Sequence, residues 1–211
     1  MAIKTHEGWR PGQEYAAKTK LEPATPQSAK VSLGKANALS DKECIPRLIK
    51  LGGDVESLHR IQITAAQSMK TAGYGYTLHN ACAATLRALL NEAGIPVKTT
   101  LGAGSLADRL STERNWGRVA LGKQQAGDVG VAQNNVHIYL VVETEGGDEM
   151  TIADNQAPTP HPRFATGKGK TPTAYFLRAP GQQLQVAAIE DMDQARSYPS
   201  VDQDTSNLRE A

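Results

Sequence analysis

Residues 80–96 read NACAATLRALLNEAGIP and predict the principal helix of the fold. The apolar residues of this segment recur at intervals of three and four and form one stripe, namely Leu86, Leu89, Leu90 and Ala93. Asn80 is a residue type that favours the N-cap position. Gly94 stands where a C-cap glycine belongs, and Pro96 prevents the helix from continuing. The segment therefore predicts a helix that begins just after Asn80 and packs its stripe against a core.

Three further helices are predicted around this one. Ser40 to Glu43 resembles a capping box, and Gly52-Gly53 closes the helix that it starts. Pro46 lies inside that helix, so we expect it to be short or kinked. Apolar residues at helical intervals predict a second helix over about residues 54–70, and a small helix follows at residues 105–110.

The second half of the chain favours strands. Residues 136–143 (VHIYLVVE) are the strongest strand candidate, and residues 128–132 form a shorter one before them. Gly146-Gly147 predicts a two-residue hairpin turn into a strand at residues 149–153, and residues 173–178 form the last strand. Because the helices come first and the antiparallel strands later, the fold class is α+β, with N-terminal helices packed on an antiparallel sheet.

Length and composition predict one folded domain with loose ends. The chain has 211 residues, of which 39% are hydrophobic and only 5% aromatic, so the core is expected to be modest and aliphatic. Residues 1–39 are rich in Lys, Ala, Pro, Gln and Ser and predict a flexible arm, and residues 181–211 predict a tail. The domain is expected at about residues 40–180.

Charge and hydropathy exclude several partners. The chain carries 23 Lys and Arg against 22 Asp and Glu, a formal net charge of +1, which gives no general attraction to nucleic acid. No stretch approaches the roughly 20 apolar residues that a membrane span requires, and the N-terminal residues lack the apolar core of a signal peptide. We therefore expect a protein made in the cytoplasm, with export or injection by a specialised system left open.

The two cysteines, Cys44 and Cys82, exclude a disulfide scaffold and do not predict a metal site. They form no Cys-x-x-Cys pair, and no His-x-x-x-His spacing accompanies them. Cys44 precedes Ile45 and Pro46 on its helix without a partner, and we interpret it as structural. The sequence predicts no metal and no cofactor.

Cys82 is the candidate nucleophile. It falls in the first turn of the predicted helix, where unpaired N–H groups and the positive end of the helix dipole favour a thiolate. The same N–H groups can hold a developing oxyanion. The alternative is that Cys82, four residues before Leu86, is small apolar filling on the buried face of the helix.

His137 is the candidate base. In the predicted strand it shares one face with Tyr139 and Val141, opposite the most apolar face. If the start of the Cys82 helix covers the face that carries His137, the thiol and the imidazole meet and form an activated pair. His79, three residues before Cys82, is a substitute base only if His137 points elsewhere.

A third residue is needed to orient the imidazole, and the segment TIADNQ offers Asp154 and Asn155. With a two-residue turn at Gly146-Gly147, residue 139 pairs with 154, and Asp154 lies diagonally next to His137 on the same face. A three-residue turn shifts the register by one residue and substitutes Asn155. We favour Asp154 over Asn155.

These residues carry a resemblance to a known superfamily. Gln125-Ala126-Gly127-Asp128-Val129, followed by His137-Ile138-Tyr139, resembles the Pro-Gly-Asp-Leu/Val and His-Val-Gly-Ile-Tyr segments of NlpC-type and CHAP-type cysteine peptidases. In that papain-like superfamily a cysteine at a helix start precedes the strand histidine by several dozen residues. The resemblance covers roughly residues 70–180. The usual proline before Gly-Asp is Ala126 here, and Ala81 stands where Asp or Asn commonly precedes the nucleophile.

The resemblance implies a papain-like hydrolase with Cys82, His137 and either Asp154 or Asn155 in the catalytic roles. Members of the superfamily mostly cut amide bonds in bacterial cell-wall peptides, so a peptide or peptidoglycan substrate is implied. Some are injected toxins, which implies a cognate immunity or inhibitor protein as partner. Related enzymes place a substrate-contacting or oxyanion-supporting tyrosine before the nucleophile, which makes Tyr76 a candidate, together with Asn80.

Two other functions stay open from the sequence. The same residues would serve an effector that acts on a host protein as a protease, deamidase or transamidase. A non-enzymatic adaptor, in which Cys82 and His137 are coincidental, is the second alternative. Of these functions, the sequence favours a cysteine hydrolase with an α+β fold.

Overall fold

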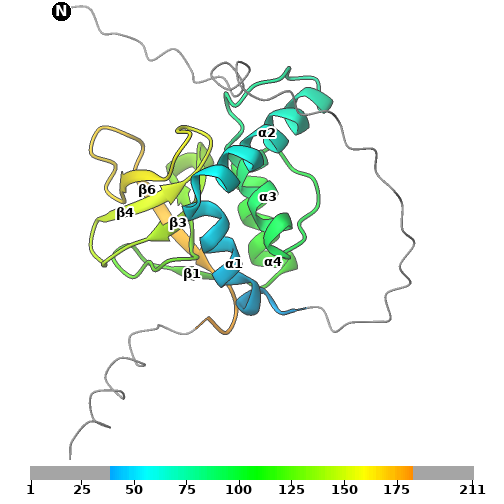
Figure 1. The fold of residues 1–211 in the computed structure, drawn as a ribbon. Coiled ribbons are helices and arrows are strands. Elements are labelled where there is room, and N and C mark those ends of the chain that lie inside the picture. Colours follow the sequence, from blue (N-terminus) through cyan, green and yellow to red (C-terminus); the bar gives the residue numbers. More distant parts are fainter. Residues whose placement is uncertain (1–38, 183–211) are drawn as a thin grey trace, which may run out of the picture.

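The structure is a computed structural model that describes residues 39–182 (Figure 1). The predicted arm at residues 1–39 and the predicted tail at residues 181–211 lie almost wholly outside the described residues. The described part is an α+β fold, as predicted, with the helices gathered on one side of an antiparallel sheet (Figure 1).

The helices come first in the chain. They are α1 (Asp41–Gly53), α2 (Val55–Thr71), α3 (Cys82–Ala93) and α4 (Ala103–Glu113). The Glu43 carboxylate accepts hydrogen bonds from the backbone N–H and the hydroxyl of Ser40, both at 2.7 Å, so the predicted capping box starts α1. Gly94 ends α3 with a left-handed φ of 102°, as expected of a C-cap glycine.

Helix α1 is not short, so the first of the two alternatives expected from Pro46, a short or a kinked helix, is wrong. It runs for 13 residues through the proline. Ile45 and Leu48, on either side of Pro46, are both buried in the core. Tertiary packing of this apolar face therefore compensates for the hydrogen bond that proline cannot donate.

Six strands form one sheet in the order β1-β6-β2-β3-β4-β5, and every neighbouring pair is antiparallel. The strands are β1 (Gly117–Val119), β2 (Val129–Ala132), β3 (Ile138–Glu143), β4 (Glu149–Ala153), β5 (His161–Phe164) and β6 (Thr173–Arg178). β4 and β6 have the predicted bounds, and β2 and β3 begin one and two residues later than expected. β1 and β5 were not predicted, because both are short edge strands without an apolar alternation.

The sheet buries both of its faces. Ile138 and Leu140 belong to the main core, which they share with α1, α3 and α4. Tyr139 and Val141, which alternate with them, belong to a separate cluster with Phe176 that contains no helical residue. The helices thus cover the Ile138 face of β3 and leave the Tyr139 face to the strands and loops.

The β3–β4 connection differs from the predicted two-residue turn. Five residues, 144–148, join the strands, because Asp148 leaves the strand to accept hydrogen bonds from the N–H and hydroxyl of Thr166. A bulge between Val141 and Glu143 then restores the alignment of the strands. Leu140 pairs with Ala153, which is the register that the two-residue turn predicted.

No helix within residues 39–182 combines the length and the apolar character needed to cross a lipid bilayer.

Gly130 provides a test of this packing. It lies opposite Tyr139 in the β2–β3 pair, and a Cβ at this position would overlap the fully buried Tyr139 ring. We expect Gly130→Ala to lower the free energy of unfolding by about 1–3 kcal/mol, because the ring has no space to move. Gly117→Ala is the matched control, since a Cβ there meets no atom within 4 Å. Urea unfolding measures both, and equal stabilities would contradict the packing described.

Candidate active site

Cys82 is the first residue of α3, and Ala81, not Asn80, is its N-cap. The prediction that Asn80 caps the helix is therefore wrong. Asn80 has a left-handed φ of 58° within a tight turn that the Ala81 N–H closes by bonding to the Leu78 carbonyl at 3.1 Å. Asparagine tolerates this conformation, which explains its place in the turn. The turn leads directly into α3, of which Cys82 is the first residue.

The sulfur of Cys82 is surrounded by hydrogen-bond donors. The side chain is only 6% exposed and lies in the core at the start of α3. Its thiol forms a hydrogen bond with the His137 imidazole and accepts from the backbone N–H groups of Ala83 and Ile138. One donor comes from the helix and two come from the beginning of β3, so the sulfur lies where these two elements meet.

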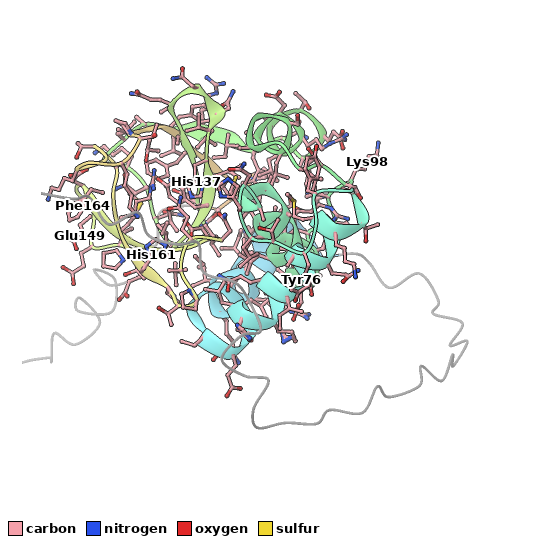
Figure 2. All side chains as sticks on the ribbon, turned by 90° about the horizontal axis from the view of Figure 1, so that it is seen from above. Tyr76, Lys98, His137, Glu149, His161 and Phe164 are labelled. Carbon is pink, nitrogen blue, oxygen red and sulfur yellow. The ribbon has the colours of Figure 1, made fainter. Side chains whose placement is uncertain are left out.

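His137 immediately precedes β3 and is buried between the sheet and the helices (Figure 2). Its Nε2 lies 2.8 Å from Oδ2 of Asp154. With Nε2 engaged, Nδ1 is the ring nitrogen left to face the sulfur of Cys82. The ring also stacks on Tyr139, with 5.8 Å between the ring centroids.

The route by which Cys82 and His137 meet differs from the expected one. The helices cover the Ile138 face of β3, not the Tyr139 face. Val136 has helical φ and ψ angles and is 59% exposed. The prediction that the strand and its alternation begin at Val136 is therefore wrong. The start of α3 meets His137 at the beginning of β3, where the backbone N–H of Ile138 donates to the sulfur of Cys82.

Asp154 is the first residue after β4, and its side chain is almost completely buried. Besides His137, its carboxylate accepts hydrogen bonds on Oδ1 from the Gln156 N–H at 2.6 Å and from Nε2 of His161 at 3.1 Å. Its backbone carbonyl accepts from Nε2 of Gln62, in α2, at 2.8 Å. The carboxylate is thus held on both oxygens.

Asn155 points away from the imidazole. Its Nδ2 donates to the carbonyl of Leu78 at 2.8 Å and ties the end of β4 to the turn that precedes Cys82. Of the two candidates for the third position, the structure therefore brings Asp154 and not Asn155 to His137.

The electrostatics of the three residues are mutually dependent. Burial raises the pKa of Cys82, but the hydrogen bond and charge of His137 outweigh it, and the pKa of the thiol is lowered. Burial likewise lowers the pKa of His137, but Asp154 and Cys82 outweigh it, and the pKa of the imidazole is raised. The pKa of Asp154 is lowered despite its burial, because His137 and His161 both donate to it. The geometry thus favours a thiolate–imidazolium pair backed by a carboxylate.

A cavity of about 390 Å³ lies beside this site. It is lined by Met69, Tyr74, Thr77, His79, Asn80, Leu101 and Gly102. His79 and Asn80 belong to the segment that leads into Cys82, so the cavity borders the turn before the thiol. No Asp, Glu, Lys or Arg is among its lining residues.

Two of the three remaining sequence candidates, His79 and Asn80, line the cavity. His79 is one of its lining residues, whereas the imidazole beside the sulfur of Cys82 is that of His137. Tyr76 is 45% exposed in the loop before Cys82 and lies on the helical side of His137 in Figure 2. Asn80 lines the cavity through the turn described above.

Cys44 lies apart from the site. It is 2% exposed, and burial together with the nearby Asp41 and Glu43 raises its pKa. Within residues 39–182, no three His, Cys, Asp or Glu side chains are grouped so that they would hold a metal ion.

Sequence reasoning missed His161 and Gln62, which both bind Asp154. His161 lies on β5, a short edge strand whose sequence shows no apolar alternation. Gln62 lies among the buried residues of α2, where a polar residue in the apolar face was the available signal.

Comparison of this chain with protein-family models, with curated proteins and with solved structures gives no match.

The reactivity of the two thiols tests the electrostatics. We expect iodoacetamide to modify Cys82 at pH 6 much faster than a thiol of pKa about 8.5, because its pKa is lowered. His137→Ala should strongly slow this low-pH reaction, since the imidazole makes the largest contribution that lowers the pKa of Cys82 against burial. Cys44 is the internal control and should stay unmodified in the folded protein. Mass spectrometry of peptides distinguishes the two; a Cys82 that reacts only above pH 8 would contradict the expected pair.

Proposed function

We propose that this protein is a papain-like cysteine hydrolase that cleaves amide bonds. The observation that supports this best is a pair of buried hydrogen bonds: Cys82, at a helix start, bonds to His137, and His137 bonds to Asp154. An activated nucleophile, a base and a group that orients the base are the parts that acyl transfer requires.

The reaction follows from these positions. The Cys82 thiolate attacks the carbonyl carbon of the amide, and an S–C bond forms as the carbonyl oxygen becomes an oxyanion. In the first turn of α3 the Ala83 N–H donates to the Cys82 sulfur, which leaves the N–H groups of Cys82 and Ala84 to donate to that oxyanion. His137 gives its Nδ1 proton to the leaving nitrogen, and the C–N bond breaks.

The second half of the reaction uses the same groups. Water attacks the thioester carbon while neutral His137 takes its proton, the S–C bond breaks, and the acid product leaves. Throughout, Asp154 holds the Nε2–H tautomer and stabilises the imidazolium when it forms.

We propose the peptides of bacterial cell-wall peptidoglycan as the substrate. The support is the resemblance of the Gly127-Asp128-Val129 and His137-Ile138-Tyr139 segments to NlpC-type and CHAP-type enzymes. The cavity at the turn before Cys82, lined by His79 and Asn80, is the place that we propose for the acyl part of such a peptide.

Purified sacculi test the nucleophile and the substrate together. We expect the protein to release soluble peptides or new amino groups from them, and Cys82→Ser to reduce the rate roughly 10³-fold or more. Near-wild-type activity in the variant would exclude Cys82 as nucleophile. Incubation with denatured casein runs in parallel, because cleavage of casein without release from sacculi would favour a protein-directed effector.

The cavity is tested by filling it. Gly102 has an extended backbone, and a Cβ there makes only ordinary contacts with Ser105, so Gly102→Val fits the chain and projects into the cavity. We expect a fall in kcat/KM of about tenfold or more, because the acyl group is displaced. The low-pH alkylation of Cys82 should not change.

Gly117→Val is the matched control for this variant, since Gly117 lies on the exposed strand β1 with no atom near its Cβ position. It should keep the wild-type kcat/KM. Equal activity of Gly102→Val and Gly117→Val would show that substrate does not occupy the cavity.

A further inference from the structure

His161 is the residue next to the site to which the proposed reaction assigns no role. It lies on edge strand β5, where it pairs with Ile152, two residues before Asp154. In Figure 2 it lies on the strand side of His137, away from the helices and the labelled Tyr76. Its side chain is 16% exposed and its Nε2 lies 3.1 Å from Oδ1 of Asp154.

The Asp154 carboxylate is divided between two imidazoles. Oδ2 faces Nε2 of His137 at 2.8 Å, and Oδ1 faces Nε2 of His161 at 3.1 Å. An ionised carboxylate only accepts hydrogen bonds, so both histidines must carry a hydrogen on Nε2 for these contacts to form. The backbone N–H of Gln156 supplies the third donor, also to Oδ1.

This division fixes the plane of the carboxylate. Oδ1 already accepts from the Gln156 N–H at 2.6 Å, and His161 adds a second donor to it from edge strand β5. With Oδ2 facing His137, the rotation of the carboxylate about its Cβ–Cγ bond is restricted from both sides. The backbone on either side is held independently, because Gln62 binds the carbonyl oxygens of Asp154 and Ala157 at 2.8 and 2.7 Å. His161 therefore acts on the side chain of Asp154 and not on the course of the chain.

We propose that His161 is a positioning residue of the hydrolase site. Together with the Gln156 N–H, it holds Oδ1 of Asp154 so that Oδ2 stays directed at Nε2 of His137, which in turn keeps Nδ1 directed at the Cys82 sulfur. This inference rests on the proposed function for its catalytic meaning, but its geometry is independent of the substrate. The group contributes through Asp154 and touches neither thiol nor acyl group.

Two substitutions of equal length separate the hydrogen bond from the packing. His161→Gln keeps an N–H donor at similar reach, and His161→Met has the same length without a donor. We expect His161→Met to lower kcat on the order of tenfold with KM unchanged, because a hydrogen bond to a buried charged group is lost. His161→Gln should retain most of the wild-type kcat.

The pH dependence of Cys82 alkylation is the readout that a merely structural role would not change. The midpoint for His161→Met should move to higher pH, in the direction of Asp154→Asn, whereas that of His161→Gln should remain close to wild type. Indistinguishable profiles and rates for the Gln and Met variants would overturn the proposal. Thermal unfolding verifies that both variants are folded, and His161→Phe replaces the Met variant if that one is not.

The two proposals fail in different ways. If no amide is cleaved by the wild-type protein but the alkylation midpoint moves as expected, His161 still positions the triad and the hydrolase function is wrong. If amides are cleaved and the midpoint does not move, the hydrolase function stands and the positioning role of His161 is excluded.

Discussion

The pairing of β3 with β4 is the constraint on which the site depends. Leu140 lies opposite Ala153, so the residue before β3 and the residue after β4 emerge at the same end of the two strands. That end is where His137 meets Asp154 at 2.8 Å. A slip of one residue would turn Asp154 to the helical face and present Asn155 instead. The bulge at Val142 maintains this register although the connection is longer than the turn that would give it directly.

The second requirement is that α3 begins at that same end. Ala81, Ala83 and Ala84 on either side of Cys82 are all 0–1% exposed, and their small side chains let the helix start approach the core closely. Asn155 adds a direct connection, because its side chain holds the Leu78 carbonyl in the turn before Cys82. The position of the sulfur is therefore set by the strand that also carries the carboxylate. Displacement of either element would disturb both halves of the thiol–imidazole pair.

Local patterns in the sequence were sufficient for much of this fold. The stripe of α3, the capping box of α1 and the bounds of β4 and β6 follow from periodicity and end signals that act within a few residues. The choice of Asp154 over Asn155 depended only on the register. Local signals failed where tertiary contacts decide: Asn80 forms a turn rather than a cap, and Val136 leaves the strand. The contact of His161 with Asp154 could not be predicted, because it depends on the pairing of β4 with β5, and the sequence of β5 has no pattern that predicts a strand.

The remaining question is whether Cys82 is apolar filling, and the two cysteines answer it by contrast. Both are buried, at 2% and 6% exposure, so burial alone does not distinguish them. Cys44 has the carboxylates of Asp41 and Glu43 nearby, which raise its pKa further and leave it an ordinary inert thiol. Cys82 is surrounded instead by an imidazole and two backbone N–H groups, which lower its pKa in spite of its burial. A filling residue needs no such donors, and a buried His137 and Asp154 would be costly to maintain if they served no purpose beyond packing. The arrangement of donors around one thiol, and their absence around the other, is what favours a nucleophile.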